Sequence, residues 1–229
     1  MAPPQACGLG TPQRRLLQAA ADGDLQLFKR AARALDAGKG CLREAVEAVK
    51  RRGAGSLHLA AGRGRMVVCA YLVEEVLVDI NAADDSGDTP LAYAVHEGSV
   101  DVVQYLLDHN ANPDSPNGKG STPLHYAAAG GNCEIVKALL SKGANVDSNG
   151  DTGTPLHNAA FFKRDGAMKI LLDHHADCNK IFNTVCTPLF TALTAGSMEC
   201  VKLLIKAGAD VKGVGTVTPL IIAANNGFN

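Results

Sequence analysis

The chain has 229 residues, no tryptophan and only 4% aromatic residues, and its net charge is −1. Its seven cysteines include no Cys-x-x-Cys pair, and no secretory leader or bilayer-spanning apolar run is present. These features predict a cytoplasmic or nuclear protein with reduced thiols and no membrane partner. The charge divides into +7 over residues 1–65 and −8 over residues 66–229, and the acidic part argues against nonspecific nucleic-acid binding.

A repeat of about 33 residues organises the sequence. Thr-Pro-Leu occurs five times, beginning at Thr89, Thr122, Thr154, Thr187 and Thr218, and Gly55-Ser56-Leu57 is a degenerate earlier copy. This period predicts stacked supersecondary units rather than a globule around one active centre. In chain order, the predicted segments are a disordered tail (1–10), a degenerate capping unit with an insertion (11–52), five repeats (53–86, 87–119, 120–151, 152–184 and 185–215) and an incomplete sixth repeat (216–229).

The capping unit begins at Thr11-Pro12, and Leu16 and Gly23 keep the seven-residue offset from leucine to glycine that later copies share. The distance from Leu16 to Leu57 exceeds the period by about eight residues, which we assign to a glycine turn at 38–40 and a helical stretch at 42–50. This insertion either lengthens the second helix or forms a side loop. The basic balance of residues 1–65 indicates either a solvated helical cap or a surface for acidic partners.

Each repeat is predicted to contain two short helices. Thr-Pro suits a helix start, because threonine can cap the helix and proline fits its first turn. Small residues then follow, as in Ala127-Ala128, and a turn glycine such as Gly131 stands seven positions after the leucine. Apolar residues at helical spacing build the second helix, for which Ser99, Asn132 and Ser197 are predicted caps. The second helices stop at Gly143-Ala144-Asn145, Gly208-Ala209-Asp210, Asn110-Ala111-Asn112 and His175-Ala176-Asp177.

With these motifs the sequence resembles the ankyrin repeat family. The pattern of that family combines Thr-Pro-Leu-His, Ala-Ala, a glycine turn, a leucine-rich helix and Gly-Ala-Asp or Gly-Ala-Asn. The match covers residues 53–229. The resemblance implies an all-α ankyrin repeat solenoid of antiparallel helix pairs with projecting β-turn fingers. It also implies a concave face, made of fingers and inner helices, that binds another protein.

The two ends of the chain carry separate expectations. The chain stops at Asn229 before any second helix of the sixth repeat, which would leave Leu220, Ile221 and Ile222 uncovered, so we expect a truncated piece of a longer protein. The start Ala21-Asp22-Gly23-Asp24 with Leu25 to Lys29 resembles plant proteins in which a tetratricopeptide module follows an ankyrin array.

No catalytic or metal-binding constellation is predicted. His58, His125 and His157 each follow the aligned leucine, and the resemblance implies that they bond to neighbouring backbone and finger groups. His174-His175 beside Cys178 lacks paired metal-ligand spacing. Gly118-Lys119-Gly120-Ser121 lacks the leading glycine of a phosphate-binding loop, so Lys119 is expected on an exposed finger. We therefore expect no enzyme, no cofactor, no metal and no small-molecule substrate.

The predicted binding surface lies at the second, fifth and sixth positions after the aligned leucine, which the family directs toward the concave face. The candidates are Leu59, Arg63, Tyr93, His96, Glu97, Tyr126, Asn158, Phe161, Phe162 and Thr191. Exposed aromatic side chains concentrate binding energy, so Tyr93, Tyr126, Phe161 and Phe162 are the expected hot spots. The alternative is that Phe161 or Phe162 turns inward beside the small alanines.

The fourth repeat departs from the pattern, since Lys163 replaces the turn glycine and Gly166 enters the next helix. This departure is either adaptation to a partner or drift. The sequence is consistent with two functions for the chain. One is a noncatalytic scaffold for a partner protein, and the other is a regulatory or targeting domain for a tetratricopeptide module or an enzyme beyond Asn229.

Overall fold

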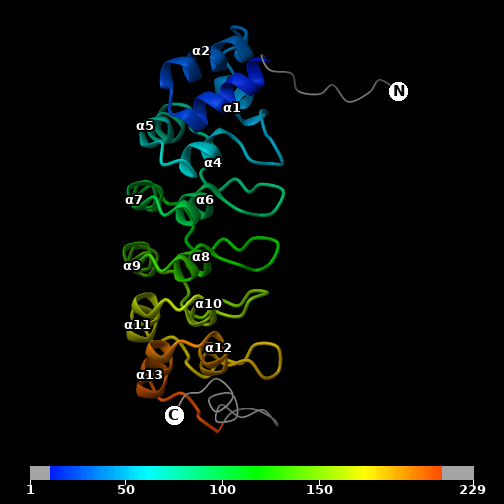
Figure 1. Ribbon diagram of the computed structural model, residues 1–229. Helices are drawn as coiled ribbons and strands as arrows, with labels where there is room; N and C mark the ends of the chain where they lie inside the picture. The colour runs from blue at the N-terminus through cyan, green and yellow to red at the C-terminus, as the bar shows by residue number, and fades with distance from the viewer. Residues whose placement is uncertain (1–10, 213–229) are drawn as a thin grey trace, which may run out of the picture. The chain divides into compact units, whose positions relative to one another are not determined.

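The computed structural model describes residues 11–212, which form two compact units divided between Asn112 and Pro113. Within these residues the only regular elements are helices (Figure 1). No helix in this described part of the chain is long and apolar enough to cross a membrane. The expectations for Thr218, Leu220 to Ile222 and the incomplete sixth repeat at 216–229 lie outside the described residues.

Unit 1 contains eight of the helices in the described residues. They are α1 (Pro12–Asp22), α2 (Leu25–Asp36), α3 (Leu42–Glu47), α4 (Ser56–Ala61), α5 (Met66–Ala70), the π-helix η1 (Tyr71–Glu75), α6 (Pro90–Glu97) and α7 (Val100–Asp108). The inner helix α4 packs against α1 on one side and α6 on the other, and the outer helices α5 and α7 are also in contact.

Unit 2 repeats the same helix pair three times. Its helices are α8 (Pro123–Gly130), α9 (Cys133–Ser141), α10 (Pro155–Phe161), α11 (Asp165–Asp173), α12 (Pro188–Ala195) and α13 (Met198–Lys206). The inner row is α8, α10 and α12, and the outer row is α9, α11 and α13. Loops project from the inner helices on the side away from the outer helices (Figure 1).

Helices α1 and α2 form a helix pair at the start of unit 1. Gly23 ends α1 with φ 83°, and Leu16 and Phe28 are fully buried. Phe28 packs edge-on against Tyr71, with ring centroids 6.1 Å apart. The insertion does not lengthen α2, which ends at Asp36, and it is not only a loop. It forms the short helix α3, which packs against α2.

Local sequence explains where the helices start. The Thr89 and Thr187 side chains accept hydrogen bonds from the backbone N–H of Ala92 and Phe190. Asn132 and Ser197 also cap their helices through the side chain. Ser99 is the N-cap residue of α7, as predicted, but its side chain makes no cap hydrogen bond.

The inner helices approach closely because the small residues face their neighbours. Ala127, Ala128, Ala159 and Ala160 are all at most 1% exposed. The same holds in unit 1, where the equivalent positions of α4 are fully buried. These alanines form the core of each inner row, and the aligned leucines lie beside them.

Left-handed residues end the helices where the sequence predicted. Gly98, Gly131 and Gly196 have φ between 74° and 77°. Lys163 occupies the equivalent place in the fourth repeat with φ 57°, and Gly166 lies in the first turn of α11. A side chain at positive φ is strained, so this departure carries a cost in stability.

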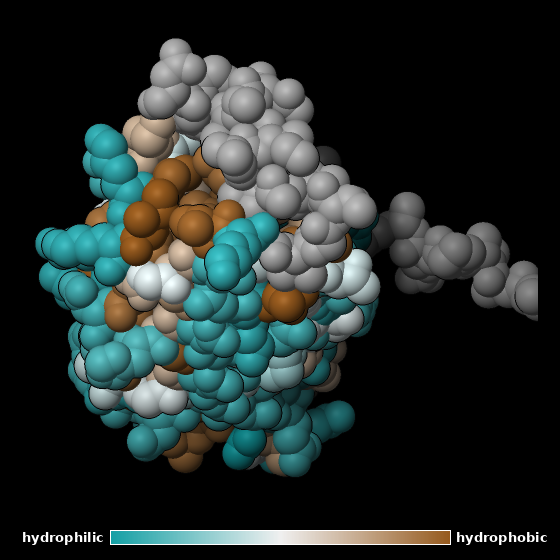
Figure 2. Space-filling view, turned by 90° about the horizontal axis from the view of Figure 1, so that it is seen from below, coloured by the Kyte–Doolittle hydropathy of each residue, from teal (hydrophilic) through white to brown (hydrophobic). Residues whose placement is uncertain are grey.

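The side of unit 2 on which α12 and α13 lie has a mixed surface. Figure 2 shows hydrophobic side chains there among hydrophilic ones. The exposed large apolar residues in this part include Met198, Ile205 and Val211. Single exposed apolar residues are common on protein surfaces, so they carry no functional assignment by themselves.

Candidate functional site

Each of the three predicted histidines joins its own inner helix to the finger that follows that helix. In His125, Nδ1 accepts a hydrogen bond from the Thr122 N–H at 3.0 Å, and Nε2 donates to the Gly153 carbonyl at 3.0 Å. His157 bonds in the same way to Thr154 and to the Cys186 carbonyl. The roles expected of these histidines from the family pattern are therefore present.

His58 makes the equivalent bonds in unit 1. Its Nδ1 accepts from the Gly55 N–H at 3.2 Å, and Nε2 donates to the Asp88 carbonyl at 3.2 Å. Burial lowers the pKa of His58, His125 and His157 below the ordinary value of 6.5. The neutral form is favoured in all three, so these side chains serve as structural links at neutral pH.

A second set of bonds links successive repeats at the ends of the outer helices. The Asn112 N–H donates to the Asn81 side chain at 2.8 Å in unit 1. In unit 2, three N–H groups donate to the side chain of a residue 30 or 31 positions earlier, namely Asn145 to Asp114, Asp177 to Asp147 and Asp210 to Asn179. We call these four pairs the Asx ladder.

Two arginines, which sequence reasoning missed, clamp neighbouring repeats. Arg65 donates from Nε to the Ala21 carbonyl at 3.0 Å, and its side chain covers Gly23. Arg164 does the same at the Ala129 carbonyl and Gly131. Both arginines stand eight positions after the aligned leucine, and this shared register was the signal that could have revealed them.

Five of the candidate binding residues lie in unit 2. Tyr126, Asn158 and Thr191 occupy the same register on α8, α10 and α12 and are half-buried. Because these helices pack side by side, the three side chains follow one line across the inner row. The Tyr126 hydroxyl accepts a hydrogen bond from the Asn117 side chain at 2.8 Å, which ties the ring to its finger.

The Phe161 and Phe162 side chains both face solvent. Phe161 is 62% exposed and Phe162 is 48% exposed. Their rings meet edge to face with centroids 5.0 Å apart. The alternative that one of them turns inward is excluded, because Ala159 and Ala160 already fill the space between the inner helices.

The other five candidates lie in unit 1. Leu59 and Tyr93 are half-buried at equivalent places on α4 and α6, whereas Arg63, His96 and Glu97 are exposed. The Tyr93 hydroxyl donates to the Asp84 carboxylate at 2.8 Å, and its ring packs edge-on against His58. The Tyr93 ring is therefore held by its own finger, as the Tyr126 ring is in unit 2.

The remaining reactive side chains are dispersed. Among residues 11–212, no three His, Cys, Asp or Glu side chains are placed to hold a metal ion. Burial raises the pKa of the Cys69 thiol to about 12 and also raises the pKa of Cys178 and Cys200. Such thiols are poor nucleophiles at neutral pH. Lys119 is exposed on its finger, as predicted.

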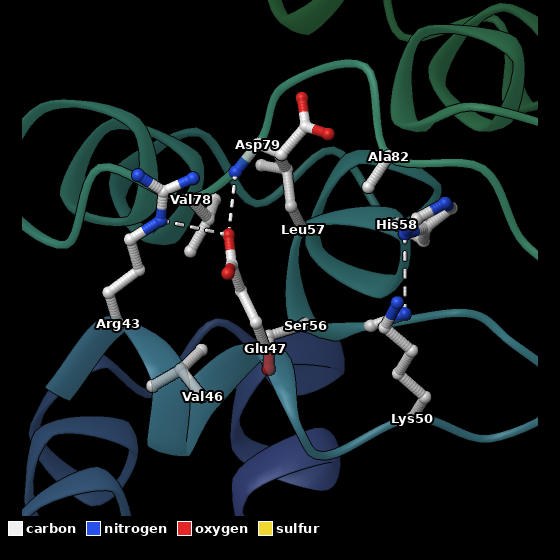
Figure 3. A pocket seen from close by; sticks show the side chains of 11 residues that line it. Arg43, Val46, Glu47, Lys50, Ser56, Leu57, His58, Val78, Asp79 and Ala82 are labelled. Atoms are coloured by element: carbon white, nitrogen blue, oxygen red, sulfur yellow. Dashed lines mark hydrogen bonds and ion pairs between the residues drawn. The ribbon is translucent and has the colours of Figure 1, made fainter. Parts of the chain in front are cut away.

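A cleft in unit 1 was also not indicated by the sequence. It lies between α3 of the insertion, the start of α4 and residues 78–82, and has a volume of about 240 Å³ (Figure 3). Its walls carry two cations, two carboxylates and a buried serine. The insertion creates this cleft, because α3 supplies one wall.

Comparison with known proteins supports the repeat assignment. The family model described as ankyrin repeats in three copies matches residues 16–117 and 109–182, and the single ankyrin repeat model matches residues 186–214. The crystal structure of the human ASB11 ankyrin repeat domain superposes with a TM-score of 0.76 and 28% identity, covering 90% of each chain. The predicted all-α ankyrin repeat fold is confirmed.

Two curated relatives align with most of this chain. Transient receptor potential cation channel subfamily A member 1 of Homo sapiens is 30% identical over 186 residues, which are 75% of this chain and 16% of that protein. Phosphate system positive regulatory protein PHO81 of Saccharomyces cerevisiae is 28% identical over 195 residues, which are 76% of this chain and 15% of that protein. The chain thus spans about one sixth of each relative.

Proposed function

Because the chain belongs to the ankyrin repeat family, whose repeats generally mediate binding between proteins, we propose that it is a noncatalytic scaffold for a partner protein. The partner is proposed to lie across the inner helices, on the concave face that the family uses. The proposal includes no cofactor, no nucleic acid, no membrane and no small-molecule substrate, and it places the protein in the cytoplasm or nucleus.

The exposed pair Phe161 and Phe162 is the observation that carries this proposal. Two adjacent phenylalanines at 62% and 48% exposure place much apolar surface in water. A partner that covers these rings would bury that surface, which is how aromatic residues come to dominate binding energy. Tyr126 and Asn158 lie on the same inner row and provide polar groups beside the rings.

The strain at Lys163 supports the same placement. Lys163 follows the two phenylalanines directly and holds φ 57° without the glycine found in the other repeats. Residues with strained backbone dihedral angles cluster at functional sites such as binding surfaces. We therefore favour adaptation to a partner over drift as the reason for this departure.

A second candidate is a regulatory or targeting role within a longer protein. The observation that favours it is the length of the relatives, of which the aligned part is only about one sixth. A tetratricopeptide module or an enzyme beyond Asn229 belongs to this candidate. The comparisons give no support to the plant subtype. Sequencing the full transcript separates the two candidates.

The test is affinity capture with residues 1–229, followed by mass spectrometry of the bound proteins. We compare the wild type with the Tyr126→Ala, Phe161→Ala double variant and with a Phe161→Ser, Phe162→Ser variant. The second variant is the cleaner one, because Tyr126→Ala also removes the bond to Asn117. A partner lost in both variants at unchanged helical circular dichroism supports the proposal.

The matched control is Val67→Ala together with Ile205→Ala. Both residues are exposed and apolar, at 63% and 51%, but they lie on the outer helices α5 and α13. The control variant is expected to retain the partner. Equal capture by the wild type and the Phe161→Ser, Phe162→Ser variant contradicts binding across the inner helices.

A further inference from the structure

A buried hydroxyl lines the cleft between α3 and α4. Ser56 is 3% exposed, and its Oγ makes no hydrogen bond to any residue of the range 11–212. The other inner helices described here carry proline at this position, as at Pro90 and Pro123. A buried, unpaired hydroxyl destabilises the fold, and an apolar side chain here would avoid that loss.

Arg43 and Lys50 are the two cations that line the same cleft. Arg43 is already engaged, because its Nε contacts the Glu47 Oε1 at 3.2 Å. The same Glu47 oxygen accepts the Asp79 N–H at 2.9 Å. Lys50 forms no ion pair within the described part of the chain, and its amine faces the cleft near His58 (Figure 3).

The cleft combines these polar groups with apolar walls. Val46 comes from α3, Leu57 from α4, and Val78 and Ala82 from the segment that follows the π-helix. The Asp79 carboxylate points away from α3 and α4 (Figure 3), and its Oδ1 accepts the Asn81 N–H. Beyond the pair of Arg43 and Glu47, the cleft therefore offers the Lys50 ammonium, the Ser56 hydroxyl and a short apolar wall.

We propose that this cleft binds a carboxylate on a short aliphatic stem, supplied by a glutamate side chain in an acidic segment of a partner protein. The carboxylate pairs with the Lys50 ammonium, and the Ser56 hydroxyl donates to it after a rotation about χ1. The methylene groups of glutamate lie against Val46 and Leu57. The excess of seven positive charges in residues 1–65 attracts such a segment from solution.

This inference rests on the proposed function in one respect, namely that the glutamate bound in the cleft belongs to a partner protein. The cleft lies in unit 1, whereas the phenylalanine pair lies in unit 2. A synthetic peptide therefore tests the cleft by itself. The probe is fluorescein-labelled hexaglutamate, measured by fluorescence anisotropy against the whole chain, with labelled hexaglutamine as the uncharged comparison.

We expect hexaglutamate to bind and hexaglutamine not to bind. Lys50→Gln should weaken hexaglutamate binding by about fourfold, since a charge-assisted hydrogen bond to an exposed lysine is lost. The matched control is Lys39→Gln, which removes an exposed positive charge outside the cleft and should change the affinity by less than about twofold. Phe161→Ser, Phe162→Ser should leave this affinity unchanged even if it abolishes capture of the protein partner.

Ser56→Ala separates a binding role from a structural one. We expect weaker hexaglutamate binding together with an unfolding midpoint no lower than that of the wild type, because the variant removes a buried hydroxyl that has no partner. Equal losses for Lys50→Gln and Lys39→Gln would show general attraction to a basic surface and would overturn the proposal. Unchanged affinity in Ser56→Ala would remove the hydroxyl from the site.

Discussion

The Arg164 guanidinium reaches back 35 residues, and its Nε donates to the Ala129 carbonyl at 3.0 Å. Its methylene groups cover Gly131, where an added Cβ would lie 2.6 Å from the Arg164 Cδ. The glycine therefore serves both the left-handed turn and the close approach of the arginine. The arginine links the fourth repeat to the third in a way that no short motif predicts.

Arg164→Ala should lower the free energy of unfolding by about 1 kcal/mol, because one hydrogen bond between repeats and the packing on Gly131 are lost. Urea denaturation followed by circular dichroism measures the change. Arg63→Ala is the matched control, since Arg63 is exposed and makes no such bond. Equal effects of the two substitutions would contradict a specific role for Arg164.

Lys163→Gly should raise the free energy of unfolding by about 1 kcal/mol, because glycine adopts φ 57° without the strain of a side chain. Thermal or urea unfolding provides the measurement. Lys169→Gly, at an exposed position inside α11, should instead lower stability by about 1 kcal/mol. A destabilised Lys163→Gly variant would mean that the lysine side chain makes a compensating contribution.

Stability should fall as the pH drops from 7.5 toward 5.5. Burial lowers the pKa of His58, His125 and His157 in the folded state, so the unfolded chain binds protons first as the pH falls through its value of about 6.5. Each histidine contributes a slope of up to about 1.4 kcal/mol per pH unit. Urea titrations at several pH values measure this slope.

His125→Gln should reduce that pH dependence while lowering stability at pH 7.5. The substitution removes a group that titrates and also breaks the bond from Nε2 to the Gly153 carbonyl. At low pH the lost hydrogen bond destabilises the variant, whereas the lost titrating group spares it the acid destabilisation of the wild type. The free energies of unfolding of the variant and the wild type should therefore converge on acidification. A pH slope identical to that of the wild type would assign the acid sensitivity to other groups.

Cys41 should react with iodoacetamide long before Cys69 does at pH 7.5. Cys41 is exposed, whereas Cys69 is fully buried and its pKa is raised to about 12 by burial. Alkylation requires the accessible thiolate. Peptide mass spectrometry over a time course reports both sites, and denaturation in urea should equalise their rates. Early labelling of Cys69 would indicate frequent opening of α5.

Much of the fold could be predicted because the sequence repeats its local chemistry. Thr-Pro marks the start of α6, and Gly98 marks its end. Each of these signals lies within a few residues of the helix end that it determines. The left-handed Lys163 could also be predicted, since its position was defined by the glycines of the other copies.

The parts that could not be predicted depend on contacts between distant residues. The bond from Arg65 to Ala21 spans 44 residues, and the register that Arg65 shares with Arg164 does not identify the carbonyl that accepts it. Ser99 takes the N-cap position that its local pattern predicts, but its hydroxyl lies close to Gly64 of the preceding repeat and makes no cap hydrogen bond. The α3–α4 cleft requires the three-dimensional placement of an insertion that has no counterpart in the repeats.

The Asx ladder also has a mechanical consequence. In unit 2 its three bonds join consecutive repeats in series, so tension applied between the ends of this unit would act on all three junctions with the same force. Each junction is held by this bond together with the packing of its neighbouring helices. The weakest junction would therefore set the force at which the unit first opens.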